Sequence, residues 1–135
     1  MANARRNRPA QWFQAACPSA ALLGDMVYID GERTGDIYPV RRCDISAQYQ
    51  RPAGMIVFKA TSTSCLVQLF GEISDIYSGL TPGGHLFLGH GAGARLTHVF
   101  PGPATTTKLY SQLAGMALAS DRLFLDIQEP IVLVP

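Results

Sequence analysis

Ser78-Gly79-Leu80-Thr81-Pro82-Gly83-Gly84 is the stretch that decides the expected fold, because it reverses the chain between two runs typical of β-strands. Pro82 fixes φ near the value needed at the first central position of a turn, and Gly83 can take the positive φ that a type II turn needs next. The flanking runs are short, apolar and rich in residues that favour strands: Leu66–Ile73 before the turn and His85–Gly89 after it. The sequence therefore predicts a strand, a tight turn and a second strand.

A second pair of strands follows further along the chain. Ser120-Asp121-Arg122 joins Gly115–Ala119 to Leu123–Gln128. In the second run, Leu123, Leu125 and Ile127 alternate with Phe124, Asp126 and Gln128. A period of two places alternate side chains on opposite faces, so one face can be buried while the other meets solvent or a partner.

The remaining segments extend the same pattern. Gly24–Gly31 and Asp36–Val40 predict a hairpin, and the continuous apolar run Met55–Ala60 is typical of a strand covered on both faces. Ile131–Pro135 predicts a terminal or edge strand, whereas Ala10–Leu23 is rich in alanine and Pro18 limits any helix there to a turn or two. No helical period runs longer than about three turns. Many short strands separated by turns indicate an all-β protein, a single small β-barrel or a sandwich.

Bulk composition limits the class of protein. At 135 residues the chain has the length of one domain, and 47% hydrophobic against 16% charged residues excludes a disordered chain. The formal net charge of +1 supplies no field that would draw the protein to nucleic acid or to a membrane, and we expect neither as a partner. No apolar run approaches the roughly 20 residues of a membrane span, so we expect a product that is soluble when made. A surface with few charges favours contacts with other protein.

Cys17, Cys43 and Cys65 are irregularly spaced and form no C-x-x-C pair. Such spacing favours buried free thiols over a zinc or redox site. An odd number of cysteines also argues against a secreted disulfide scaffold and for assembly in a reducing cytoplasm.

The N-terminus is expected to be distinct from the rest of the chain. Residues 1–21 predict an extended basic arm that carries Arg5, Arg6 and Arg8, and residues 22–135 predict the β-barrel domain. Such an arm either frays in solvent or lies along an acidic neighbouring surface. Trp12 and Phe13 are either a plug for the core or anchors of an interface.

Sequence motifs for catalysis, metal binding or cofactor binding give little evidence of such a site in this chain. The run Gly89-x-Gly91-x-x-Ala94 fits a loose dinucleotide motif, but no helix follows to receive a pyrophosphate. His85, His90 and His98 could converge on zinc only if a hairpin brought them together, and no carboxylate or cysteine joins them at ligand spacing. There is no G-x-S-x-G elbow. We therefore expect no enzyme, no catalytic residues, no metal and no cofactor.

Several motifs, taken in order, resemble a family of tailed-bacteriophage capsid cement or head decoration proteins, related to head-fibre and tail-spike base modules. The similarity spans roughly Leu22 to Leu133. The motifs that carry it are Gly24–Gly31, Gly71-Glu72-Ile73, Ser78–Gly83, Leu86-Phe87-Leu88, Gly93, Leu96-Thr97, Gln112–Ala119 and Leu123–Ile131. The family often has Tyr-Tyr-Leu where this chain has Leu86-Phe87-Leu88, and Val-Gly where it has Ala114-Gly115. Both differences keep the apolar character of a strand.

The resemblance implies a β-barrel sometimes called a tulip, commonly a homotrimer, located on the outer capsid surface of the virion after assembly in the host cytoplasm. The implied partner is the major capsid protein, whose subunits such a cement protein would hold together. Arg5, Arg6 and Arg8, with Trp12 and Phe13, would then be the capsid-contact residues of the arm. The alternative that the resemblance leaves open is a fibre or tail-spike base or a receptor-binding module, with Tyr77, His90 and Phe100 exposed on loops.

Overall fold

The computed structural model describes residues 11–43, 51–89, 94–99 and 110–132, and all regular structure in them is β-strand. Five strands close into a barrel in the order β1-β3-β2-β4-β5: β1 (Trp12–Ala16), β2 (Met26–Ile29), β3 (Tyr38–Arg42), β4 (Gly54–Thr61) and β5 (Ser64–Gln68). The expectation of an all-β protein with a small barrel is confirmed. Among the described residues, no helix is long and apolar enough to cross a membrane.

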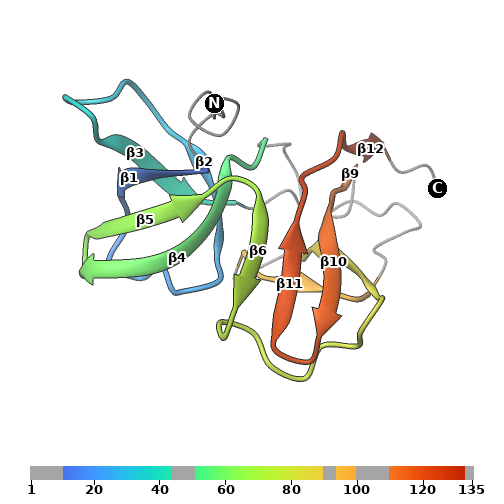
Figure 1. Cartoon of the computed structure of the whole chain (residues 1–135). Helices are drawn as coiled ribbons and strands as arrows, with labels where there is room; N and C mark the ends of the chain where they lie inside the picture. The colour runs from blue at the N-terminus through green and yellow to red at the C-terminus, as the bar shows by residue number, and fades with distance from the viewer. Residues whose placement is uncertain (1–10, 44–50, 90–93, 100–109, 133–135) are drawn as a thin grey trace, which may run out of the picture.

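A second sheet lies beside the barrel, as Figure 1 shows. Its order is β6-β11-β10-β7-β8, with β6 (Gly71–Ser74), β11 (Arg122–Leu125), β10 (Leu113–Ala119), β7 (His85–Leu88) and β8 (Leu96–Thr97). A two-stranded sheet pairs β9 (Tyr110–Ser111) with β12 (Ile131–Val132), which places the expected last strand at an edge.

The turn Thr81–Gly84, which directly precedes β7, has the predicted form. Gly83 takes a φ of 82°, and the Gly84 N–H donates to the Thr81 carbonyl at 2.9 Å, which together make a type II turn with Pro82 at its first central position. The predicted hairpin of β2 and β3 is also present, as is the antiparallel pair of β10 and β11. In β11 the expected alternation holds, because Leu123 and Leu125 are buried while Phe124 is only partly covered.

The expectation of one continuous strand over Leu66–Ile73 is wrong. The run is split between β5 in the barrel and β6 in the second sheet, and Leu69 and Phe70 connect them. Gly71 takes a φ of 104°, which a residue with a side chain rarely adopts. The chain changes sheets at this glycine.

The N-terminal segment also differs from expectation. Residues 12–16 form β1, which pairs antiparallel with β5 along its whole length and parallel with β3 at Ala15 and Ala16. The barrel therefore begins inside the segment 1–21 that was expected to be an arm, and residues 1–10 lie outside the described residues. Phe13, Ala15 and Cys17 face inward while Trp12, Gln14 and Ala16 face outward, a period of two that the high alanine content disguised.

Two apolar cores lie on opposite faces of the same barrel strands. Val27 and Ile56 point into the barrel, whereas their neighbours Met26 and Met55 point out of it and pack against the second sheet. All four side chains are fully buried, so the first half of the Met55–Ala60 run is covered on both faces as predicted. Further along β4, Phe58 is 58% exposed.

The three cysteines are buried free thiols, as expected. Cys17 and Cys65 belong to the barrel interior, and Cys43 belongs to the core between barrel and second sheet. Burial raises the pKa of the Cys43 thiol to about 12, because a thiolate would lose its hydration there.

Gly54 of β4 lies too close to β5 to accept a side chain, and its replacement gives the first prediction. A Cβ at this position would overlap the Gln68 carbonyl oxygen and lie 2.8 Å from Val67 Cγ1. Gly54→Ala should lower the free energy of unfolding by about 2–3 kcal/mol, since backbone must move to make room. Ala60→Ser, on an exposed position of the same strand, should change it by less than about 0.5 kcal/mol. Urea unfolding of both variants measures this, and equal midpoints would contradict it.

Candidate functional site

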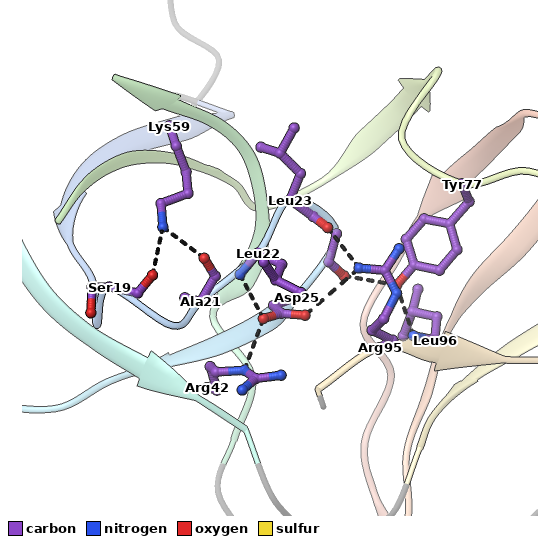
Figure 2. A network of polar contacts seen from close by, with 11 residues as sticks. Ser19, Ala21, Leu22, Leu23, Asp25, Arg42, Lys59, Tyr77, Arg95 and Leu96 are labelled. Atoms are coloured by element: carbon purple, nitrogen blue, oxygen red, sulfur yellow. Dashed lines mark hydrogen bonds and ion pairs between the residues drawn. The ribbon is translucent and has the colours of Figure 1, made fainter. Parts of the chain in front are cut away.

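A buried carboxylate joins the barrel to the second sheet (Figure 2). Asp25 directly precedes β2 and is fully buried. Its Oδ2 accepts a hydrogen bond from the Leu22 N–H at 2.8 Å and lies 2.8 Å from Nε of Arg42 on β3, while its Oδ1 lies 3.8 Å from Nη1 of Arg95. The Arg42 contact is an ion pair by distance without the alignment of a hydrogen bond. Two cations therefore compensate one buried negative charge.

Backbone and phenol hydrogen bonds continue this junction. The Tyr77 hydroxyl donates to the Gly24 carbonyl at 2.7 Å and accepts from the Leu96 N–H at 2.8 Å. Arg95 stacks its guanidinium 4.5 Å from the centre of the Tyr77 ring and donates to the Leu23 carbonyl at 2.7 Å. Burial raises the pKa of Tyr77, so the phenol stays protonated and able to donate. We call Asp25, Arg42, Tyr77 and Arg95 the polar seam.

A groove of about 540 Å³ opens on the surface where the barrel meets the second sheet. Trp12 and Phe13 of β1 and Tyr38 of β3 form its barrel side, and Leu69 and Phe70 of the connection between the sheets continue it. Phe13 and Tyr38 meet edge to face with ring centres 5.1 Å apart. The groove is completed by Ile29, Arg51, Pro52, Ala53, Asp126 and Ile127.

The apolar surface continues from this groove onto the outer face of the second sheet. Phe70 meets Phe124 of β11 edge to face at 5.1 Å, and Phe124 stands opposite Met116 of β10 in the strand register. Phe124 and Met116 line a second hollow of about 210 Å³, and Asp126 borders both hollows. We call this surface the apolar track and define it as Trp12, Phe13, Tyr38, Leu69, Phe70, Phe124 and Met116.

Exposure sets the apolar track apart from the core. Trp12 is 53% exposed, Phe70 45%, Met116 40% and Leu69 37%. Ion pairs stand at its rim: Arg51 reaches Glu129 at 3.4 Å, and Arg122 reaches Glu72 at 3.4 Å, with all four side chains at least half exposed. An apolar centre with a polar, solvated rim is the anatomy of a protein–protein interface.

His98 links the turn to β7 through both nitrogens of its ring. His98 Nε2 accepts from the Thr81 N–H at 2.9 Å, which leaves Nδ1 to donate to the His85 carbonyl at 2.8 Å. Within residues 11–43, 51–89, 94–99 and 110–132, no three His, Cys, Asp or Glu side chains are grouped to hold a metal ion. His90 lies outside the described residues.

The expected capsid-contact residues fall into two groups. Arg5, Arg6 and Arg8 lie outside the described residues, whereas Trp12 and Phe13 are consecutive residues of β1 and both line the groove. Trp12 is exposed and fits the reading of an interface anchor, while Phe13 is partly buried and packs against the barrel interior.

Sequence reasoning missed most of the apolar track. It contributes no expectation for Leu69 and Phe70, because both were assigned to the interior of a continuous strand. Two signals did point to this surface: the alternation in Leu123–Gln128 places Phe124 on the face opposite the buried leucines, and Trp12 and Phe13 were among the expected contact residues. Tyr77, expected to be exposed in a receptor-binding module, is instead partly buried in the polar seam.

No protein-family model, no curated protein and no solved structure matches the chain. The function therefore has to be argued from the geometry of the apolar track and from the motifs in the sequence.

The polar seam predicts a difference between two neighbouring Asp–Arg pairs. Asp25→Asn removes the charge that compensates Arg42 and Arg95, and it should lower the free energy of unfolding by about 2–4 kcal/mol. Asp30→Asn, which breaks the exposed pair with Arg41, should cost less than about 1 kcal/mol. Chemical unfolding of both variants tests this. Equal losses of unfolding free energy in the two variants would show that the buried pair contributes no more to stability than the exposed pair.

Proposed function

We propose that this chain is a non-enzymatic structural protein of a tailed-phage virion, where it binds the outer capsid surface as a cement protein. The observation that carries the proposal is the apolar track, an exposed aromatic surface with a charged rim at the junction of the two sheets. Such a surface fits a flat protein partner better than a small molecule, because its largest side chains are distributed along an open face. The resemblance of the sequence motifs supplies the identity of the partner, the major capsid protein.

The energetics of the apolar track suit this role. Trp12 and Phe70 each offer roughly 1.5–3 kcal/mol if a partner buries them completely, and large aromatic side chains are the residues on which interfaces most often depend. A cement protein needs only moderate affinity at each contact, because copies that clamp adjacent subunits act together.

Oligomeric state forms part of the proposal. A homotrimer would present three apolar tracks related by a threefold axis, and a capsid surface repeats its own subunits in the same symmetric way. The basic residues Arg5, Arg6 and Arg8 would add charge pairing with capsid carboxylates beside each track.

A fibre or tail-spike base module is the second candidate function. The exposed ring of Trp12, with Asp126 and Arg51 in the same groove, offers the mixture of an aromatic face and polar groups that a host glycan or protein could use. Tyr77 does not support this candidate, because its hydroxyl already donates one hydrogen bond and accepts another within the polar seam.

The number of copies per particle separates the two candidates. Quantitative mass spectrometry of purified virions should give a ratio of this chain to the major capsid protein near one if it covers the shell. A handful of copies per particle would overturn the cement proposal and place the chain at a tail, spike or vertex.

The apolar track itself is tested by replacement of exposed aromatic side chains. Trp12→Ala and Phe70→Ala should each weaken binding to capsids assembled without this chain by about 10- to 100-fold, as expected for central interface residues. Phe58→Ala is the matched control, because Phe58 is 58% exposed on β4 and lies outside the track. Sedimentation of capsids with increasing protein measures the affinity, and thermal unfolding checks that each variant is folded. Equal binding by all three variants would exclude the track as the contact.

A further inference from the structure

Two of the three cysteines meet inside the barrel at the contact between β1 and β5. The strand register pairs Ala15 with Cys65 and Ala16 with Ser64, and the Cys17 N–H continues the ladder by donating to the Thr63 carbonyl at 3.0 Å. Cys17 is therefore the diagonal neighbour of Cys65 on the inward face of an antiparallel pair. Diagonal neighbours share one face of the strand pair, about 7–8 Å apart between their Cα atoms.

The side chains of Cys17 and Cys65 are both enclosed in the barrel interior. Cys17 and Cys65 belong to the same buried cluster, in which the Cys17 thiol donates to the Ser62 carbonyl at 4.0 Å. Burial first, and then the contact with Cys17, raise the pKa of the Cys65 thiol to about 12, while the Lys59 ammonium acts in the opposite direction. Lys59 stands directly opposite Cys65 in the register of β4 and β5. Two buried thiols thus lie on the same inward face, with Lys59 opposite one of them.

We propose that Cys17 and Cys65 form a reversible disulfide when the protein passes from a reducing to an oxidising environment, and that this bond fastens β1 to β5. Cys17 and Cys65 lie one diagonal step apart on the same inward face, so a bond between their sulfurs keeps the existing pairing of β1 with β5. Cys43 is excluded as a partner because it packs in the separate core between barrel and second sheet. The proposal does not depend on the function proposed above.

The oxidant is a low-molecular-weight disulfide such as oxidised glutathione. The thiolate of one cysteine attacks a glutathione sulfur, which forms a mixed disulfide and releases one reduced glutathione. The thiolate of the other cysteine then attacks the protein sulfur of that mixed disulfide and releases the second. The two protein thiols lose two electrons and two protons in total, and one oxidised glutathione becomes two reduced molecules.

The bond would act on the strand that closes the barrel. β1 is the strand whose pairing with both β3 and β5 completes the ring, and it also carries Trp12 and Phe13 of the apolar track. A link from Cys17 to Cys65 would enclose β2, β3 and β4 in one covalent loop. Because such a loop restricts the unfolded chain, the bond should stabilise the folded state.

The experiment uses the full chain, fully reduced, then unfolded and refolded in buffers that contain reduced and oxidised glutathione at set ratios. Unfolding exposes the buried thiols to the oxidant, so slow access in the folded state does not decide the result. Intact mass should show the loss of two hydrogens, and peptide mapping without reduction should join the peptides of Cys17 and Cys65. The thermal midpoint of the oxidised protein should rise by roughly 10 °C and return to the starting value on reduction.

Three variants test which cysteines form the disulfide. Cys43→Ala should still lose two hydrogens and gain the same thermal shift, whereas Cys17→Ala and Cys65→Ala should show neither. A wild-type protein that keeps three free thiols, that accumulates bound glutathione, or that joins Cys43 to either partner would overturn the proposal. The mapping on the wild-type chain stands even if one of the variants folds poorly.

Discussion

The structure depends on the burial of one charge, the carboxylate of Asp25. Removing a carboxylate from water costs several kcal/mol unless opposite charges and hydrogen bonds replace its hydration. Leu22, Arg42 and Arg95 supply these, and the two arginines come from β3 in the barrel and from the residue before β8 in the second sheet. Because the guanidinium groups stay partly exposed, they keep much of their own hydration while neutralising the buried oxygen atoms. The barrel and the second sheet therefore share one electrostatic anchor, and the Met26 N–H reinforces it with a bond to the Ala94 carbonyl.

The distribution of side-chain volume explains why a barrel of five strands needs its neighbour. The barrel interior contains many small residues, including Ala15, Cys17, Ala21 and Cys65, because a ring of five strands leaves little space inside. The larger core lies between the sheets, where Met26 and Met55 meet leucines of the second sheet. The barrel interior can bury only one face of a strand that is apolar on both faces. The second sheet is therefore part of the same folding unit, because it covers the outer faces of β2 and β4.

Local features of the chain were the ones that sequence reasoning predicted well. Pro82 and Gly83 define a turn wherever they occur in this order, and the alternation through Leu123 and Leu125 defines a strand and its buried face. The errors arose where tertiary context decided the outcome. Alanine is compatible with helix and strand, so nothing local showed that Trp12–Ala16 completes a barrel through partners about 20 residues away in β3 and about 50 residues away in β5. The seam could not be predicted for the same reason, because the spacing of Asp25, Arg42 and Arg95 follows no motif.

The apolar track shows how a surface can depend on the interior beneath it. Its residues come from β1, β3, the connection between β5 and β6, β11 and β10, so no single segment of the chain defines it. The track residues of the barrel and those of the second sheet form one continuous surface only while the barrel and the second sheet keep their relative placement. That placement is set by the packing of Met26 and Met55 and by the polar seam. Trp12 and Phe124 stand on strands, and Phe70 stands in the short connection between β5 and β6 with its ring against Phe124, an arrangement that would lower the entropy lost on binding a partner.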